Sequence, residues 1–269
     1  MAKIIAEIGW NHMGDMKLAE EMISSAARNG ADYCKFQTWS EDSLKPGLWD
    51  TDGRREIYKK AQLSEDDHHF LKEVCSKHSV EFMTSVFNKN DLPMLERLNM
   101  DIIKIPSHEV HNIELIQEAA KLFDTIIVST GASKWNEVIN IVEKVEKSKL
   151  ILMHCVSTYP CPFNQANFPR IDSIRESFDV SVGYSGHCEG IEDGIAALSK
   201  GVDFVEKHFT TDHDLPGRDN KFAILPKQMK ILSQFRDHFL EMKIDLGKNL
   251  QECEMDTFKN YRGRWSKDV

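Results

Sequence analysis

The chain has 269 residues, 41% of them hydrophobic and 29% charged, so it can bury a full hydrophobic core. Its formal net charge of −9 argues against nucleic acid as the main partner, because phosphate contacts need a basic surface. We expect no signal peptide and no membrane span, since no apolar run approaches the roughly 20 residues that cross a bilayer. The six cysteines form no Cys-x-x-Cys pair, which favours reduced thiols and a cytoplasmic protein.

Eight short apolar runs recur along the chain, and each is followed by residues with helical periodicity. The predicted strands cover residues 4–8, 33–37, 81–85, 102–106, 125–129, 150–156, 180–184 and 202–209. Near-continuous apolar runs are typical of parallel strands that are covered on their faces. The pattern predicts an α/β fold, a single-domain (β/α)8 TIM barrel over residues 1–250, with a doubly wound sheet as the alternative.

The segments between the strands carry helix signals. Asp15, Ser64 and Asn112 are expected to precede helices, and Pro226 is expected in the first turn of the last one. His68 and His69 are expected to face solvent. Residues 40–63 and 159–170 are longer than ordinary loops and follow strand ends, where barrel enzymes keep their sites. Residues 251–269 are predicted to be a tail outside the barrel.

All eight predicted strand ends carry polar side chains. They are Glu7 and Asn11; Lys35 and Gln37; Thr84 and Ser85; Lys104 and Ser107; Ser129 and Thr130; His154, Ser157 and Tyr159; Ser185 and His187; and Glu206, Lys207 and His208. Lysines supply point charge and hydroxyls supply short donors. Lys35 and Lys104, with the hydroxyls of Ser85, Ser107, Ser129 and Ser185, therefore predict a cradle for phosphate and carboxylate groups.

His187 and His208 end neighbouring predicted strands. Two imidazoles with few carboxylates nearby indicate a weakly held divalent cation with open positions for substrate. The alternative is a hydrogen-bonded core histidine, and that alternative carries more weight for His154. Lys35 could pair with Glu7 inside the barrel. The predicted ligands are an anionic phosphorylated acid and a metal-bound carbonyl compound.

Seven segments together resemble the N-acetylneuraminate (sialic acid) synthase family. They are AEIGWNHMGDMKLAEEMISSAARNGADYCKFQT, FMTSVF, IIKIPSHEVHN, IIVSTGAS, LMHCVSTYPCPFNQANF, VGYSGH and EKHFTTDHDLPGRDN. They run in the family's order and cover nearly the whole chain. The resemblance implies a barrel enzyme that condenses phosphoenolpyruvate with an N-acyl hexosamine, giving a nonulosonic (sialic-acid-type) sugar acid and phosphate by metal-assisted carbon–carbon bond formation.

The resemblance also implies roles for individual residues. Phosphoenolpyruvate would be held by Lys35, Ser85, Lys104, Ser107, Ser129, Ser157 and Ser185; the sugar by Glu7, Gln37, Tyr159 and Asp219; and manganese or magnesium by His187 and His208. Lys35, Lys104 and His208 would be catalytic together with Glu109, the expected proton-transfer group.

The chain departs from the family's pattern within the predicted barrel. Ser157 stands where the family commonly has Asn, and Pro-Gly-Arg-Asp-Asn at residues 216–220 replaces the usual Pro-Gly-Pro-Asp-His. The residues at 251–269 resemble the start of the linker to the family's antifreeze-like domain. A homodimer is expected, and a separate antifreeze-like chain could complete it. The alternatives are another metal-dependent phosphoenolpyruvate-utilising synthase or aldolase on a TIM barrel, and a non-catalytic sugar- or anion-binding protein.

Overall fold

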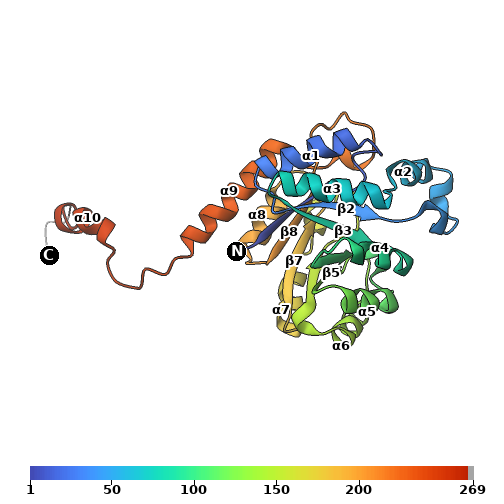
Figure 1. The fold of residues 1–269 in the computed structure, drawn as a ribbon. Helices are drawn as coiled ribbons and strands as arrows, with labels where there is room; N and C mark the ends of the chain where they lie inside the picture. The colour runs from blue at the N-terminus through green and yellow to red at the C-terminus, as the bar shows by residue number, and fades with distance from the viewer. Residues whose placement is uncertain (266–269) are drawn as a thin grey trace.

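The chain folds as a closed parallel barrel of eight strands in sequential order (Figure 1). Residues 1–265 are described by a computed structural model, apart from the side chain of Trp49. The strands are β1 (Lys3–Glu7), β2 (Tyr33–Thr38), β3 (Glu81–Val86), β4 (Ile102–Ile105), β5 (Thr125–Ser129), β6 (Leu150–His154), β7 (Ser181–Gly186) and β8 (Phe204–His208). Because β8 also pairs with β1, no sheet edge is left open. The single-domain barrel prediction is confirmed, and each predicted strand boundary lies within two residues of the observed one.

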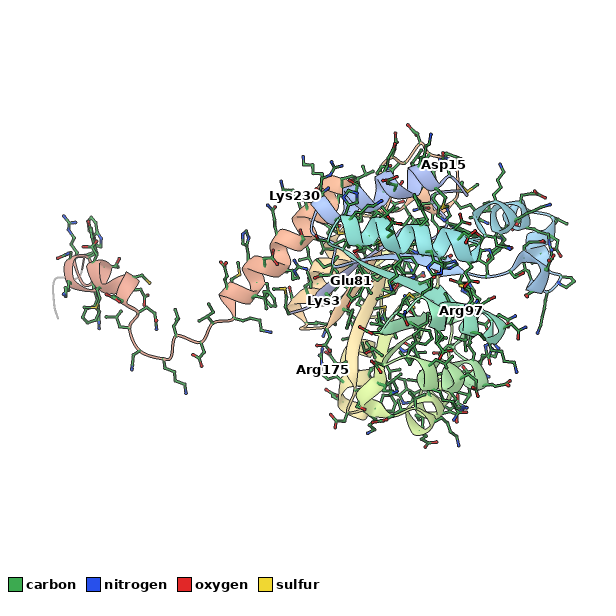
Figure 2. The ribbon with its side chains drawn as sticks, viewed as in Figure 1. Lys3, Asp15, Glu81, Arg97, Arg175 and Lys230 are labelled. Carbon is green, nitrogen blue, oxygen red and sulfur yellow. The ribbon has the colours of Figure 1, made fainter. Side chains whose placement is uncertain are left out.

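Helices connect the strands and cover the outside of the barrel (Figure 1). They are α1 (Met16–Arg28), α2 (Arg54–Ala61), α3 (Glu65–Lys77), α4 (Leu92–Arg97), α5 (Ile113–Leu122), α6 (Trp135–Lys144), α7 (Pro169–Ser177), α8 (Glu192–Ser199), α9 (Pro226–Met242) and α10 (Met255–Asn260). The predicted caps are confirmed: Asp15, at the start of α1 in Figure 2, accepts from the backbone N–H groups of Lys17 and Leu18. Ser64 forms a capping box with Asp67.

Helix α2 lies within the long segment after β2, where the sequence predicted only an extended loop. Its N-cap is Gly53 at φ +84°, a left-handed conformation that glycine adopts without strain. The indole N–H of Trp39 donates to the carbonyl of Tyr58 at 3.1 Å, which ties the helix to the end of β2. The rings of Trp10, Trp39 and Tyr58 pack edge to face. This aromatic contact holds α2 against the mouth of the barrel.

The barrel interior has two layers. An apolar layer fills the N-terminal half and consists of Ile5, Met83, Ile102, Ile127, Ile151 and Met153, with Tyr33 and Phe204 packed against it. Successive side chains of a strand alternate between its faces, so the next inward residue toward the C-terminal end lies two positions later. Ile5 is thus followed inward by Glu7, Tyr33 by Lys35, and Phe204 by Glu206. The alternation places a polar layer next to the apolar layer, on the side of the C-terminal strand ends.

His68 contradicts the expectation that it faces solvent, because it is fully buried between α3 and the barrel wall. Its Nδ1–H donates to the Ser64 carbonyl at 2.7 Å, and its Nε2 lies 2.7 Å from Thr38 Oγ1. Thr38 Oγ1 in turn lies 2.8 Å from Thr84 Oγ1. The expectation of exposure holds for His69, the next residue of the same helix.

The tail after α9 runs away from the barrel, and α10 stands apart from it (Figure 1). Its described part exposes large apolar side chains, among them Ile244, Leu250 and Phe258. The predicted tail at residues 251–269 agrees with this arrangement as far as Trp265, and its last four residues lie outside the described part. No helix within residues 1–265 has both the length and the apolar character that crossing a membrane requires.

Candidate active site

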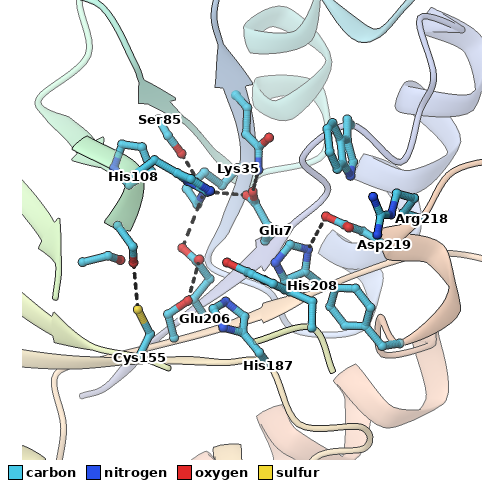
Figure 3. A pocket seen from close by; sticks show the side chains of 18 of the residues that line it. Glu7, Lys35, Ser85, His108, Cys155, His187, Glu206, His208, Arg218 and Asp219 are labelled. Carbon is cyan, nitrogen blue, oxygen red and sulfur yellow. Dashed lines mark hydrogen bonds and ion pairs between the residues drawn. The ribbon is translucent and has the colours of Figure 1, made fainter. Parts of the chain in front are cut away.

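A cavity of about 570 Å³ opens at the C-terminal ends of the strands (Figure 3). Every strand, or the residue that follows it, contributes to its wall. The inner wall consists of Glu7, Lys35, Gln37, Ser85, Lys104, Ser107, Ser129, Cys155, Ser185, His187, Glu206 and His208, and the outer wall includes Trp10, Arg54, Tyr58, Tyr159, Arg218, Asp219 and Phe222. This is the face on which barrel enzymes carry their active sites.

Two lysines and two carboxylates form a connected charge cluster at the floor of the cavity (Figure 3). Lys35 Nζ lies 2.6 Å from Glu7 Oε2 and donates to Ser85 Oγ at 2.9 Å. Lys104 Nζ donates to Glu206 Oε1 at 2.6 Å. Lys35 Nζ is also 3.7 Å from Glu206 Oε2, so Glu206 connects the two lysines. The pairing of Lys35 with Glu7 that the sequence left open is therefore present.

Burial and charge pairing act in opposite directions within this cluster. Burial opposes ionisation of Glu206, but Lys104 and Lys35 outweigh it and lower its pKa to about 2. Burial raises the pKa of Glu7, and Lys35 partly offsets that effect. Burial lowers the pKa of Lys104, against the attraction of Glu206. The two lysines thus favour the charged form of Glu206 despite its burial.

The hydroxyl side chains of the cavity are arranged around these charges. Ser185 Oγ donates to Glu206 Oε1 at 3.0 Å. Ser107 Oγ lies 3.0 Å from Cys155 Sγ. Ser129 lines the same wall and is buried. Together with Ser85, these groups give the cavity floor the donors that an anion with several oxygens requires.

His187 and His208 face each other at the ends of β7 and β8, with ring centroids 5.6 Å apart. The Nδ1–H of His187 donates to the Val156 carbonyl at 2.6 Å, which leaves its Nε2 unprotonated. Burial lowers the pKa of His187 to about 4, and burial together with His187 lowers that of His208 well below its usual value. Both rings are therefore neutral near pH 7, as metal ligation requires.

The histidine pair fits a divalent cation with open coordination positions. His208 Nδ1 is buried and has no hydrogen-bond partner; Asp219 Oδ2 is 3.3 Å away, longer than a charge-assisted hydrogen bond. A spacing of 5.6 Å between ring centroids lets one ion contact both rings, because metal–nitrogen bonds are about 2.1 Å long. Within residues 1–265 no group of three or more histidine, cysteine, aspartate or glutamate side chains could hold a metal. Water or substrate oxygens would complete such a site.

Aromatic side chains form the wall above the histidines. The Tyr159 ring lies 4.2 Å from that of His187 and 5.9 Å from that of His208, and Phe222 packs 5.0 Å from His208. Asp219 lies beside them, and burial raises its pKa to about 7 with a further contribution from Glu7. The wall beside the histidines therefore presents aromatic surface next to Asp219, and Arg54 and Arg218 lie elsewhere in the outer wall.

Twelve of the fourteen predicted site residues line this cavity, and Ser157 and Glu109 do not. Ser157 Oγ is buried without a partner behind Gly131, where an added Cβ would come within 2.3 Å of it. The Glu109 carboxylate accepts from Asn112 Nδ2 at 3.1 Å. The roles of these two residues stay predictions based on the resemblance.

The sequence placed Glu206 at a strand end but predicted no role for it, and in the structure it contacts both lysines. The two-residue spacing from Glu206 to His208 in β8 could have revealed it, since that spacing puts both side chains inside the barrel. Lys207 points outward, and its Nζ pairs with Asp193 at 2.9 Å. The Nε2–H of His154 donates to the Ala166 carbonyl at 2.8 Å, so His154 is a hydrogen-bonded core residue.

The fold and the cavity together define a TIM barrel of the enzyme type, with two buried lysines and a histidine pair in the cavity at its C-terminal face. The sequence profile of the NeuB family matches residues 22–243. The chain belongs to the NeuB family and is an enzyme of that family.

Named relatives are synthases of sialic-acid-type sugar acids. The N,N'-diacetyllegionaminic acid synthase of Legionella pneumophila is 34% identical over 249 residues, which cover 86% of this chain and 70% of that protein. The pseudaminic acid synthase of Campylobacter jejuni is 33% identical, with 82% and 68% covered. The crystal structure of N-acetylneuraminic acid (sialic acid) synthetase from Leptospira borgpetersenii in complex with citrate superposes with a TM-score of 0.87 at 30% identity, covering 99% of this chain and 93% of that one.

Proposed function

We propose that this enzyme condenses phosphoenolpyruvate with an N-acyl hexosamine to give a nonulosonic acid and phosphate. The observation that carries the proposal is the convergence of two buried lysines, several hydroxyls and two neutral histidines on one cavity. The first set suits a small acid with a phosphate group, and the second suits a divalent cation. The names of the relatives support the class of product.

The floor of the cavity would bind phosphoenolpyruvate. Lys35 and Lys104 would neutralise its carboxylate and phosphate, which could not otherwise enter a site this buried. Ser85 and Ser185 already contact the charge cluster and would donate to the same oxygens. In this arrangement the methylene carbon of the substrate is directed toward the outer cavity, where the second substrate would lie.

His187 and His208 would hold manganese or magnesium. When bound, the cation would polarise the aldehyde oxygen of the open-chain sugar. Tyr159, Asp219, Glu7 and Gln37 would contact the sugar from the surrounding wall. Gln37 donates to Glu7, which keeps that carboxylate oriented toward the cavity. A sugar that is held this way would present its aldehyde carbon to the phosphoenolpyruvate methylene.

Bond formation would leave positive charge on the former enol carbon, and water would add there before the tetrahedral intermediate expels phosphate. A base must take a proton from that water, and the former aldehyde oxygen gains a proton as it becomes a hydroxyl. The resemblance gives this role to Glu109, and Glu7 is the carboxylate that lies in the cavity beside Lys35.

Phosphate release from phosphoenolpyruvate tests the proposal. We expect release with Mn²⁺ and an N-acyl hexosamine, and none when the sugar or the cation is omitted. His208→Ala should abolish it, whereas His238→Ala, an exposed histidine on α9, should not. Protein that binds Mn²⁺ yet releases no phosphate with any of a panel of aldoses would refute the proposal. Condensation of an aldose with pyruvate and without phosphate release would identify an aldolase instead.

We further propose a cytoplasmic homodimer, with a separate antifreeze-like chain as a possible partner for the sugar's acyl group. Light scattering of the purified chain would measure its mass, and a dimer is the expected result.

A further inference from the structure

Glu206 occupies the centre of the polar floor and contacts Lys104, Lys35 and Ser185 through its two carboxylate oxygens. Its Oε1 accepts from Lys104 Nζ at 2.6 Å and from Ser185 Oγ at 3.0 Å, and its Oε2 is 3.7 Å from Lys35 Nζ. The residue is 3% exposed. Three groups expected to hold an anionic substrate are therefore already arranged around a carboxylate of the protein itself.

The charges of the floor balance without any ligand. Lys35 and Lys104 carry two positive charges, and Glu7 and Glu206 carry two negative charges when all four are ionised. A phosphorylated acid brings at least two more negative charges, and it must compete with Glu206 for the same lysines. Buried charge without compensation is costly. The floor by itself is thus poorly matched to the anion that its donors would bind.

The charges of the floor favour a cation beside the histidines. Glu206 and His208 are two positions apart on β8 and both point inward, so the carboxylate lies close to the expected metal site. Attraction between the carboxylate and a cation strengthens binding of the cation, while repulsion weakens binding of an anion.

We propose that Glu206 is an internal counter-anion: it positions Lys104, Lys35 and Ser185 before substrate arrives, and it sets the charge of the site so that the divalent cation binds before the phosphorylated acid. This inference rests on the proposed function, since phosphoenolpyruvate is the acid in question. Glu206 acts through the lysines and the charge balance, and is therefore a positioning residue.

Binding to the wild-type protein gives the first test. Calorimetry with phosphoenolpyruvate should show an affinity at least about tenfold weaker in EDTA-treated protein than with Mn²⁺, since charges a few ångströms apart in a buried site interact strongly. Mn²⁺ alone, followed by the electron paramagnetic resonance of the free ion, should bind without the acid. Equal affinity for phosphoenolpyruvate with and without Mn²⁺ would overturn the inference.

The Glu206→Gln variant gives the sharper test, because the amide keeps an oxygen for Lys104 and removes the charge. We expect phosphoenolpyruvate to bind the metal-free variant about tenfold more tightly than wild type, and Mn²⁺ alone to bind it about tenfold more weakly. A purely structural loss would weaken both, so changes of opposite sign identify the charge effect. Glu189→Gln removes an exposed carboxylate from the same cavity and should change neither affinity more than about twofold.

Other results are equally decisive. If folded Glu206→Gln binds phosphoenolpyruvate and Mn²⁺ as wild type does, or binds both more weakly, the inference is overturned. If that variant does not fold, the affinity of wild type for phosphoenolpyruvate with and without Mn²⁺ decides. If wild type releases phosphate but Glu206→Gln leaves both affinities unchanged, the inference about Glu206 is refuted and the proposed function stands. If the two affinities change in opposite directions but phosphoenolpyruvate releases no phosphate with any sugar, the proposed function is refuted and the charge effect of Glu206 is not.

Discussion

Three consecutive residues of β8 have different surroundings because side chains of a strand alternate. Glu206 and His208 point into the cavity, whereas Lys207 points outward and pairs with Asp193 of α8. Lys207 Nζ also donates to the Cys188 carbonyl at 2.7 Å, next to His187 in the chain. The outward lysine therefore helps to fix the segment that carries one of the two histidines. A shift of one residue in register would exchange these surroundings.

The role of Glu109 can be decided by one substitution. If Glu109 takes the proton from water, Glu109→Gln should lower kcat about 100-fold or more and leave KM for phosphoenolpyruvate nearly unchanged, since a general base acts on the water and does not hold the substrate. Steady-state phosphate release measures both constants. Glu114→Gln, on the exposed face of α5, is the matched control. A kcat within about twofold of wild type would exclude Glu109 and leave Glu7 as the candidate.

Helix α3 is attached to the barrel by a polar contact within an apolar interface. His68 connects the Ser64 carbonyl to Thr38 of β2, and Thr38 connects to Thr84 of β3. The ring nitrogens of His68 and the hydroxyls of Thr38 and Thr84 thus all have partners, which the free energy of burial requires. Leu71 and Val74 supply the apolar part of the same interface. The chain of hydrogen bonds fixes how α3 sits over β2 and β3.

We expect His68→Leu to lower the free energy of unfolding by about 2 kcal/mol, because the buried Thr38 hydroxyl loses one of its two side-chain partners. His69→Leu, one position along the same helix but exposed, should change it by less than about 0.5 kcal/mol. Urea denaturation at pH 7.5 measures both. Equal effects of the two substitutions would show that the buried contact does not stabilise the fold.

The cost of His68→Leu should also depend on pH. Burial lowers the pKa of His68 in the folded protein below its value of about 6.5 in the unfolded chain. The stabilisation by neutral His68 is then complete above about pH 6.5 and is lost as the pH falls toward the folded pKa. The stability difference between wild type and the variant should therefore shrink from pH 7.5 to pH 5.

At the scale of the whole molecule, barrel closure brings residues far apart in the chain to one cavity. Lys104 and Glu206 are 102 positions apart and share a hydrogen bond. Parallel pairing of β8 with β1 sets Glu7 opposite His208. The same closure leaves the segment after α9 without a place on the barrel, and its exposed apolar side chains extend away from it (Figure 1).

Removal of the tail should leave the barrel intact. A variant that ends at Ile244 should unfold within about 2 °C of the full chain, because hydrogen bonds such as Gly247 N–H to Asp245 stay within the tail. Differential scanning calorimetry measures the unfolding temperature, and light scattering shows whether the mass changes. A drop of several degrees with a halved mass would instead assign the tail to a dimer contact.

The sequence by itself determined the number, order and direction of the strands. Apolar runs separated by helical periodicity are local signals, and the polar residues that end each run indicated that Lys35 and His208 lie at strand ends. These features depend on neighbours in the chain, so they can be read without a structure. The caps Asp15 and Ser64 were predictable for the same reason.

Only the tertiary structure decided which side chains meet. It joined Glu206 to both lysines, buried His68, brought α2 with Tyr58 to the cavity and left Glu109 outside it. Such contacts depend on barrel register and on how helices pack against the wall. Register and packing are set by pairings between segments that are distant in the chain, and a local pattern does not contain them.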